Sequence, residues 1–294
     1  MPLRDWMAAL TVITAWGVNF VVIKLALTEI PPMLLGCLRF TFVAIPAVFF
    51  IKRPKVPLKT LIGYSCSISL GQFAFLFSAL YVGMPSGLAS LVLQSQAFFT
   101  VIIAMIALGE LVRLHNIVGI FVAATGLALI YMAAESGSVP LLGLFLTLMA
   151  AFSWATGNIV IKTAGKVDMI SLVVWGAIIP PIPFFILSWF IEGPEVILYS
   201  LKNITFVGVS TVFYLVVMAT LVGYVLWGRL MNKHMVSKVA PLSLMVPVLG
   251  LASGVIFLQE RLVLLQWLGG FVVLAGLAIN TFGARYFYGK KYGI

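Results

Sequence analysis

"WGVNFVVIK" occupies residues 16–24, and "WATGNIVIK" occupies residues 154–162, 138 positions further along the chain. Each stretch runs from a tryptophan through an asparagine to a lysine, inside an otherwise apolar segment. A second register has an offset of 150, where "ALGELVRLHNIVGIFVAATGLALI" from Ala107 resembles "FLQERLVLLQWLGGFVVLAGLAIN" from Phe257. Its aligned pairs are Leu108 with Leu258, Glu110 with Glu260, Gly119 with Gly269, and Gly126 with Gly276. The chain is therefore predicted to contain an internal duplication.

The composition indicates a protein of the membrane. Of the 294 residues, 63% are hydrophobic and 9% are charged, and the mean hydropathy is +1.17. Soluble domains carry about 25% charged residues, so a water-soluble fold is excluded. In a bilayer the backbone must satisfy its own hydrogen bonds, and long unbroken apolar runs favour helices over the short alternating strands of a barrel.

Apolar runs of about 20 residues predict an all-α integral membrane protein of ten transmembrane helices. The first run is too long for a signal peptide, and the connections between runs are short and rich in turn formers. The loop "EGPEVILYSLKN" accounts for the change of offset from 138 to 150. The predicted helices are 6–28, 33–51, 60–81, 88–108, 116–134, 140–162, 169–191, 206–228, 238–258 and 264–283.

The positive charges predict the orientation. With the N-terminus in the cytoplasm, the outer loops receive only Lys202 and Arg261. The cytoplasmic side receives Arg4, Lys52, Arg53, Lys55, Lys59, Arg113, Lys162, Lys166, Arg229, Lys233, Lys238, Arg285, Lys290 and Lys291. Cytoplasmic loops of membrane proteins carry such an excess, so both termini are predicted to be cytoplasmic. The net charge of +10 is then explained by the membrane topology and by contact with an anionic lipid bilayer. It does not indicate binding to a nucleic acid.

Each repeat contains five spans, and five is odd. The repeats, predicted at 1–137 and 138–294, therefore enter the membrane from opposite sides. Inverted repeats are the architecture of secondary transporters, whose substrate site lies near the bilayer midplane where the repeats meet. The alternative is a purely structural role, in which the duplication only stabilises a large helical bundle. We expect a transporter of a small-molecule substrate, either monomeric or homodimeric.

Several segments resemble those of EamA-type drug/metabolite transporters. They are "WGVNFVVIK", "LRFTFVAIPAVFF", "RPKVPL", "QFAFLF", "MPSGLASLVLQSQAFFT", "AFSWATGNIVIK" and "VAPLSLMVPVLGLAS". The resemblance covers Trp6 to Gly283 and is strongest to bacterial inner-membrane exporters of O-acetylserine and cysteine. It implies export of small amino acids and related metabolites by alternating access; aromatic amino acids, purines and drugs are alternatives on the same scaffold. One departure is Pro247 in the ninth span, where the first repeat has Ala97.

The opening stretches supply six candidate residues for the cavity. An unpaired amide is costly in lipid, so Asn19 and Asn158 should point into the bundle. They either join helices or contact substrate. Lys24 and Lys162 either reach the membrane surface, pair structurally, or contact substrate. Trp16 and Trp154 share a helix face with their asparagines and are further candidates.

A charge within the second span is the most buried candidate. Arg39 has Trp175 as its approximate counterpart, so the charge occurs in one repeat only. We expect it either to pair with Glu29 or with helix carbonyls, or to bind the carboxylate of a substrate. Further cavity candidates are Trp175 and the amides Gln72, Gln94 and Gln96, and of Gln94 and Gln96 at most one can face the cavity. By default the aromatic residues Tyr81, Tyr214, Tyr224 and Trp227 are expected to anchor the protein at the membrane interface. The alternative is that they form a cavity wall, and Tyr214 is kept as a candidate on that ground.

Other chemistry finds no support. Cys37 and Cys66 have no metal-ligand spacing, and His115 and His234 fall in predicted loops, so neither a metal nor a disulfide is expected. There is no phosphate-binding loop, dinucleotide fingerprint, HExxH or GxSxG. We therefore expect no cofactor and no enzyme; an intramembrane enzyme would need clustered His, Asp or Ser, and a channel would need a ring of like charges. Prolines within the spans predict kinks, either static or used in gating.

Overall fold

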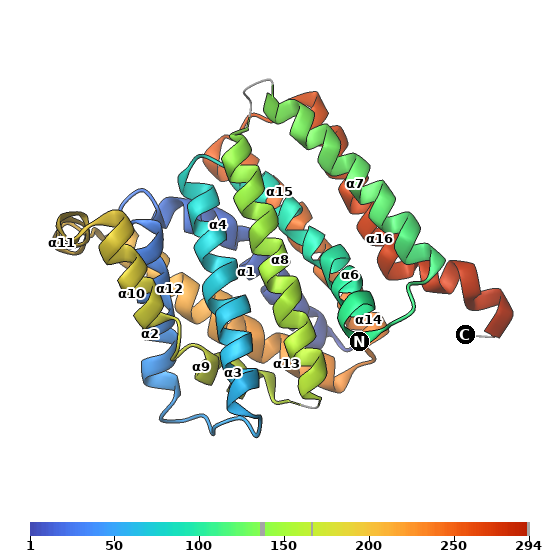
Figure 1. The fold of residues 1–294 in the computed structure, drawn as a ribbon, viewed down its shortest axis with the longest axis horizontal. Coiled ribbons are helices and arrows are strands. Elements are labelled where there is room, and N and C mark those ends of the chain that lie inside the picture. Colours follow the sequence, from blue (N-terminus) through green and yellow to red (C-terminus); the bar gives the residue numbers. More distant parts are fainter. Residues whose placement is uncertain (136–138, 166, 293–294) are drawn as a thin grey trace.

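The computed structural model describes residues 1–135, 139–165 and 167–292. Those residues form helices and turns without a strand (Figure 1). Nine helices of the described part are long and apolar enough to cross a membrane, and a tenth apolar helix of 16 residues joins them. The ten-helix fold is thereby confirmed. The predicted boundary at 137/138 and Lys166 lie outside the described residues.

The first five spans follow the prediction closely. α2 ends at Ala47 rather than at 51, because Pro46 lies inside its last turn and has no N–H for the helix ladder. The spans are α1 (Leu3–Ala26); α2 (Pro32–Ala47); α3 (Leu58–Tyr64) with a π-helical segment (Ser65–Gly71) and α4 (Gln72–Tyr81); α5 (Ser86–Val92) with a 3-10 segment (Leu93–Ser95) and α6 (Gln96–Leu108); and α7 (Leu114–Glu135).

The second five spans repeat this pattern. They are α8 (Leu141–Ala164); α9 (Met169–Gly176) with α10 (Pro181–Leu187) and a π-helical segment (Ser188–Glu192); α12 (Phe206–Val216) with a π-helical segment (Val217–Val222) and α13 (Gly223–Lys233); α14 (Val236–Val239) with a 3-10 segment (Ala240–Leu244) and α15 (Met245–Leu258); and α16 (Leu264–Tyr292). The two repeats therefore share their irregularities: the third and eighth spans contain π-helical turns, and the fourth and ninth contain 3-10 turns.

Two predictions about loops are wrong. The stretch "EGPEVILYSLKN" contains α11 (Pro194–Lys202), which begins at a proline because that residue fits the first helical position. Its apolar side chains Val196 and Leu198 are exposed, as on a helix that lies at a membrane surface. His115 lies in the first turn of α7 and is buried, because that helix begins two residues before the predicted start.

The outer surface of the bundle is apolar. More than half of the side-chain surface of Phe121, Phe213 and Phe271 is exposed, on three different spans. In water such exposure would be costly, whereas in a bilayer it costs nothing. The main buried cluster lies inside the bundle and includes Phe77 and Phe184, which are fully buried. Apolar side chains therefore face both the surrounding lipid and the interior of the bundle.

α7 and α16 show how the repeats are related. The two helices run antiparallel, side by side (Figure 1). A Cβ added to Gly126 would lie 2.6 Å from the carbonyl oxygen of Gly269, and one added to Gly269 would lie 2.7 Å from that of Gly126. Gly119 and Gly276 oppose each other in the same reciprocal way, at 2.9 and 2.7 Å. Reciprocal contacts between equivalent positions are the mark of a two-fold axis, so the repeats are inverted as predicted.

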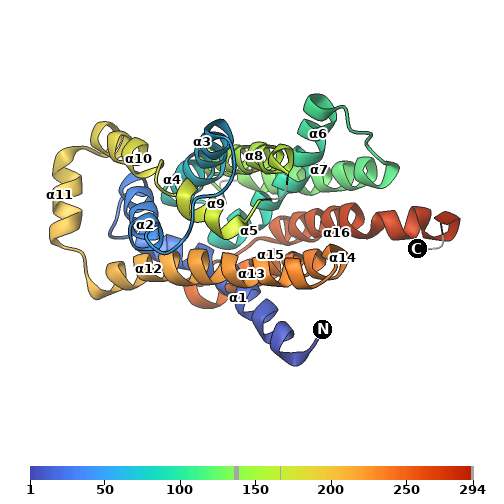
Figure 2. The same cartoon turned by 90° about the horizontal axis from the view of Figure 1, so that it is seen from below.

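The first span of each repeat crosses into the other repeat. α1 packs against α12, α13 and α15, the eighth and ninth spans, while α8 packs against α3, α4 and α6, the third and fourth. Figure 2 shows α1 beside α12, α13 and α15 on one side and α8 beside α3 and α6 on the other. This exchange joins the repeats around a shared centre. The irregular segments of the third and eighth spans lie at that centre.

Candidate functional site

Arg39 is a charged side chain buried between the repeats. It projects from α2 with 3% of its surface exposed. Its Nη2 donates to Thr220 Oγ1 at 3.1 Å, from the π-helical segment of the eighth span. Its Nε and Nη1 have no hydrogen-bond partner. The guanidinium also lies over the ring of Phe73, with 4.1 Å between Cζ and the ring centroid, a cation–π contact that stabilises the charge without using its N–H donors.

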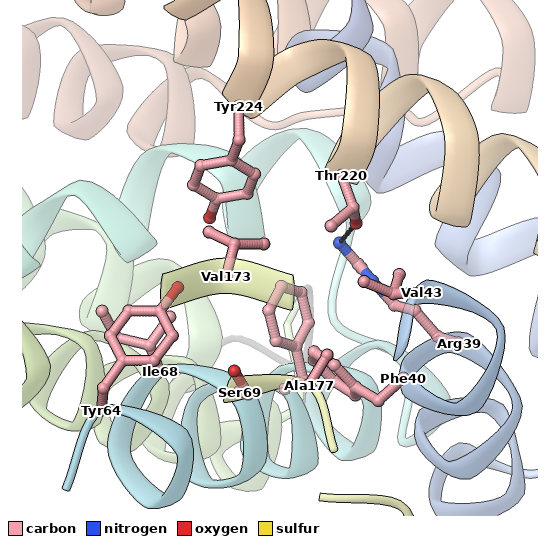
Figure 3. Close-up of a pocket in the computed structure, with 11 residues that line it drawn as sticks. Arg39, Phe40, Val43, Tyr64, Ile68, Ser69, Val173, Ala177, Thr220 and Tyr224 are labelled. Carbon is pink, nitrogen blue, oxygen red and sulfur yellow. Dashed lines mark hydrogen bonds between the residues drawn. The ribbon is translucent and has the colours of Figure 1, made fainter. Parts of the chain in front are cut away.

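A small pocket surrounds this guanidinium (Figure 3). Polar groups around it come from both repeats: Tyr64 and Ser69 from the third span, Thr220 and Tyr224 from the eighth. Figure 3 shows the hydroxyls of Tyr64 and Tyr224 turned toward each other. The remaining lining residues are Phe40, Val43, Ile68, Phe73, Val173 and Ala177. The pocket therefore combines one cation, four hydroxyl groups and an apolar wall.

In this conformation the pocket is small. Its interior space is about 10 Å³, roughly what one water molecule needs. A second cavity of about 330 Å³ adjoins it, and Val173, Thr220 and Tyr224 line both. Its other lining residues come from the C-terminal end of α2 and the turn after it, from α9, from the π-helical segment of the eighth span and from α13; Phe50 and Ile51 lie in that turn. The larger cavity therefore extends from the pocket toward the predicted cytoplasmic side.

The π-helical segments explain why the pocket lies where it does. A π turn frees backbone carbonyls from the α-helical ladder, and such turns are frequent at functional sites. Here each freed region is bonded by the first span of the opposite repeat: Trp16 Nε1 donates to Ala219 O at 2.9 Å, and Ser153 Oγ donates to Ser67 O at 2.8 Å. The two bonds join equivalent spans of the two repeats, although their donors and acceptors are not equivalent positions.

Trp16 forms the wall behind Tyr224. The centroid of its ring lies 5.6 Å from that of Tyr224 and 5.4 Å from that of Trp227. Gly223 lies against this ring, since a Cβ there would come within 2.6 Å of Trp16 Nε1. Trp16 therefore positions a pocket residue without lining the pocket. Tyr224, expected at the membrane interface, lies instead inside the bundle.

The asparagine of the second repeat joins two helices. Asn158 Nδ2 donates to Gln96 Oε1 at 2.8 Å and to Thr100 Oγ1 at 3.1 Å, which ties α8 to α6. Asn19 and Gln72 are both buried, and Asn19 Oδ1 and Gln72 Oε1 have no hydrogen-bond partner. None of these five amide and hydroxyl side chains lines the Arg39 pocket.

The remaining candidates have structural positions. Tyr214 donates its hydroxyl to Ala15 O at 2.8 Å, and Trp175 Nε1 donates to Ile51 O at 2.8 Å. Trp154 packs, partly buried, against the core, and Gln94 is half-buried in the 3-10 turn of the fourth span. The sequence therefore identified one residue of the pocket, Arg39, and one residue behind it, Trp16.

Both lysines pair with protein groups. Lys24 Nζ donates to the carbonyl of Met84 at 2.9 Å. Lys162 lies 2.6 Å from the carboxylate of Glu110, and both side chains are about half exposed. Neither lysine lines the Arg39 pocket.

The pairing of Arg39 with Glu29 is wrong. Glu29 accepts from the N–H of Thr205 at 2.9 Å and from its hydroxyl at 2.7 Å, at the start of α12. A helix start offers unpaired N–H groups and a positive dipole end, which a carboxylate satisfies. Arg39 is thus left facing the pocket.

Sequence reasoning missed Tyr64, Ser69 and Thr220. Their residue types are common in membrane helices and have no special spacing. A usable signal was the run of small and hydroxyl residues in "SCSISLG" at 65–71, since Ser and Gly weaken a regular helix. Among the described residues no group of three or more His, Cys, Asp and Glu side chains could hold a metal.

Comparisons with known proteins agree with this architecture. The model of the EamA-like transporter family matches residues 5–132 and 141–282. The chain is 47% identical to a "Probable amino-acid metabolite efflux pump" of Escherichia coli over the full length of both chains. It is 46% identical to a protein of the same description from Salmonella typhimurium, over 97% of each chain. One solved crystal structure shares the fold, with a TM-score of 0.62 at 19% identity, over 97% of this chain and 99% of that chain.

Proposed function

We propose that this chain, which belongs to the EamA-like transporter family, exports small amino acids and related metabolites across a bacterial inner membrane. O-acetylserine and cysteine are the proposed substrates. The description of the Escherichia coli and Salmonella relatives as amino-acid metabolite efflux pumps supports the class. The proposal treats the protein as a transporter without enzymatic activity.

The observation that carries the proposal is the unpartnered Arg39. A guanidinium binds carboxylates strongly through charge-assisted hydrogen bonds, and Arg39 keeps its Nε and Nη1 donors unpaired inside the pocket. No residue that lines the pocket is acidic. A substrate carboxylate would supply the hydrogen-bond acceptor that Arg39 Nε and Nη1 lack. The Thr220 hydroxyl accepts from Nη2 and so orients the guanidinium.

The other pocket groups suit the rest of an amino acid. The hydroxyl oxygens of Tyr64, Ser69 and Tyr224 can accept hydrogen bonds from an ammonium group. A cationic drug would meet the Arg39 charge with no carboxylate beside it, so the pocket disfavours that alternative. The four aromatic rings of the lining keep aromatic amino acids as a second candidate class.

Export would proceed by alternating access. In the described conformation the pocket holds about 10 Å³ and adjoins the larger cavity on the predicted cytoplasmic side. An amino acid needs more space. Loading therefore requires separation of the seventh and eighth spans, whose residues Val173 and Thr220 lie between the pocket and the larger cavity. Rocking of one repeat against the other would then open the opposite side.

Metabolite profiling of growth medium tests this function. Overexpression should raise extracellular O-acetylserine and cysteine, and deletion should lower them. An overexpressed Arg39→Gln variant, present in the membrane at the wild-type level, should behave like the empty vector. Arg39→Lys is the matched control: it retains charge but loses the planar fork and should export at an intermediate rate. An Arg39→Gln variant that exports like wild type would refute the role of the pocket, and unchanged media would refute the substrate class.

A further inference from the structure

A glutamate of the second repeat is docked on a helix of the first. The carboxylate of Glu260, in the loop after α15, accepts from the backbone N–H of Ser86 at 2.6 Å and of Gly87 at 3.0 Å. These N–H groups begin the fourth span, where the helix leaves them without partners. Lys24 lies beside this contact, bonded to the carbonyl of Met84. The contact is on the predicted outer side of the membrane.

Two further carboxylates close the same side. Glu192, at the end of the seventh span, accepts from the N–H of Met33 at 2.6 Å and of Leu34 at 3.2 Å, at the start of α2. Glu29, after α1, is bonded to Thr205 at the start of α12. All three contacts join the end of a span in one repeat to the start of a span in the other. The outer ends of the repeats are therefore fastened together.

Glu110 is the repeat counterpart of Glu260, and its backbone has the same conformation. The preceding residues, Gly109 and Gln259, are left-handed with φ of 66° and 53°. The N–H of Glu110 reaches Ala104 O at 3.4 Å, and that of Glu260 reaches Gly254 O at 3.2 Å. The side chains nevertheless differ, because Glu110 is exposed and pairs with Lys162. The two equivalent glutamates thus differ: Glu260 is docked on a helix of the other repeat, whereas Glu110 is not.

Small residues explain the difference. A Cβ added to Gly254 would collide with the Glu260 carboxylate and lie 3.0 Å from the N–H nitrogen of Gly87. At the offset of 150, the counterpart of Gly254 is Ala104 and that of Gly87 is Ser237. Ala104 therefore carries a Cβ where its counterpart Gly254 has none. A Cβ at this position would obstruct a carboxylate docked as that of Glu260 is.

We propose that Glu260 is an outer latch, and that the asymmetry between Gly254 and Ala104 makes the transporter rest closed to the outside. This inference rests on the proposed alternating access. For an exporter the arrangement has a clear consequence: the outer side stays closed while substrate is loaded from the predicted cytoplasmic side. Opening outward then requires the carboxylate of Glu260 to leave the start of the fourth span.

Outside accessibility of a pocket cysteine tests the latch without any substrate. Cys37 and Cys66 are replaced with alanine, Ser69→Cys is introduced as the reporter, and spheroplasts are treated with a membrane-impermeant thiol reagent. Glu260→Gln replaces a charged acceptor by a neutral one, and Gly254→Ala obstructs docking sterically. Each should increase the rate of outside labelling at least tenfold. Glu110→Gln is the matched control and should leave that rate unchanged.

Unchanged labelling in both Glu260→Gln and Gly254→Ala, at wild-type membrane levels, would overturn the proposal. So would an equal increase in Glu110→Gln. Because labelling is independent of what is transported, these outcomes are distinct from a failure of the proposed substrates. A protein that shows the labelling shift but exports neither O-acetylserine nor cysteine would keep the latch and lose only the substrate assignment.

Discussion

Arg39 is kept in the bundle at an energetic cost. An arginine at the centre of a span costs about 2.5–3.5 kcal/mol on insertion scales, and a hydrogen bond to a charged group returns about 1.5–3 kcal/mol. Its contacts with Thr220 and Phe73 offset part of this cost. Two donors nevertheless stay without partners. The proposed binding role would account for that arrangement, since an anionic substrate would complete the hydrogen bonds.

The Asn158–Gln96 pair has a structural role that a double-mutant cycle measures. Asn158→Leu leaves Gln96 Oε1 without its donor and should lower stability by about 0.6–1.7 kcal/mol, the range of such bonds in membranes. Gln96→Leu should cost a similar amount. The double variant should lose less than the sum, because both polar groups are then absent. Thermal unfolding in detergent is the measurement, and strictly additive losses would exclude the coupling.

Glu29 makes stability depend on pH. Hydrogen bonds from Thr205 lower the pKa of the Glu29 carboxyl below its ordinary value. A lowered pKa means that the contribution is present above the unfolded-state pKa and is lost as pH falls through the folded-state pKa. Glu29→Gln should therefore reduce the melting temperature at pH 7 and flatten its decline between pH 5 and pH 3. A variant whose profile parallels wild type would contradict this.

At the residue level, the sequence reveals a buried charge more readily than it reveals the residues that contact this charge. Arg39 stands out because a charge in an apolar span is rare. Thr220, its partner, is 181 positions away, and nothing local in the sequence connects the two. Tyr64 and Ser69 are ordinary residues that the fold alone brings to the pocket.

At the level of helices, α7 and α16 depend on the absence of side chains. Gly126→Ala would place a Cβ 2.6 Å from the carbonyl of Gly269, so the helices must separate and stability should fall. Gly228→Ala is the control, because nothing lies within 4 Å of its added Cβ. Alanine favours a helix by up to about 1 kcal/mol, so that variant should be neutral or more stable. Equal melting temperatures for the two variants would contradict the close packing.

The positions of the spans were predictable, but their internal breaks were not. Hydropathy reports that an apolar run crosses the bilayer. It does not distinguish an α-helical turn from a π or 3-10 turn, which depends on neighbouring helices. The hydrogen bond from Trp16 Nε1 to Ala219 O, which joins the first span to the π-helical turn of the eighth, is one such contact with a neighbouring helix. α11 was missed because its nine residues are too few and too mixed for a span.

For the whole molecule, the inverted repeat fixes the predicted topology. Reporter fusions at both termini should indicate the cytoplasm, and tags inserted at 136–138 or 193–198 should be accessible from the outside. The physical reason is the excess of Lys and Arg in the predicted cytoplasmic loops. Termini on opposite sides of the membrane would be incompatible with ten spans, and both termini outside would contradict the predicted orientation.

The pocket also predicts the mode of energy coupling. Proton-driven pumps generally place Asp, Glu or His within the membrane as carriers, whereas no residue that lines the Arg39 pocket is acidic or a histidine. We therefore expect purified protein in liposomes to exchange substrate without an imposed proton gradient. Coupled proton movement in a fixed ratio with substrate would contradict this facilitated mode.

The most direct test of the central claim is counterflow of labelled O-acetylserine or cysteine in liposomes, with the pH gradient and potential collapsed by ionophores. The account predicts that wild-type protein accumulates label in vesicles preloaded with unlabelled substrate. It predicts at least a tenfold slower rate for Arg39→Gln reconstituted at the same density. Counterflow by Arg39→Gln at the wild-type rate would contradict the assignment of the substrate site to the Arg39 pocket.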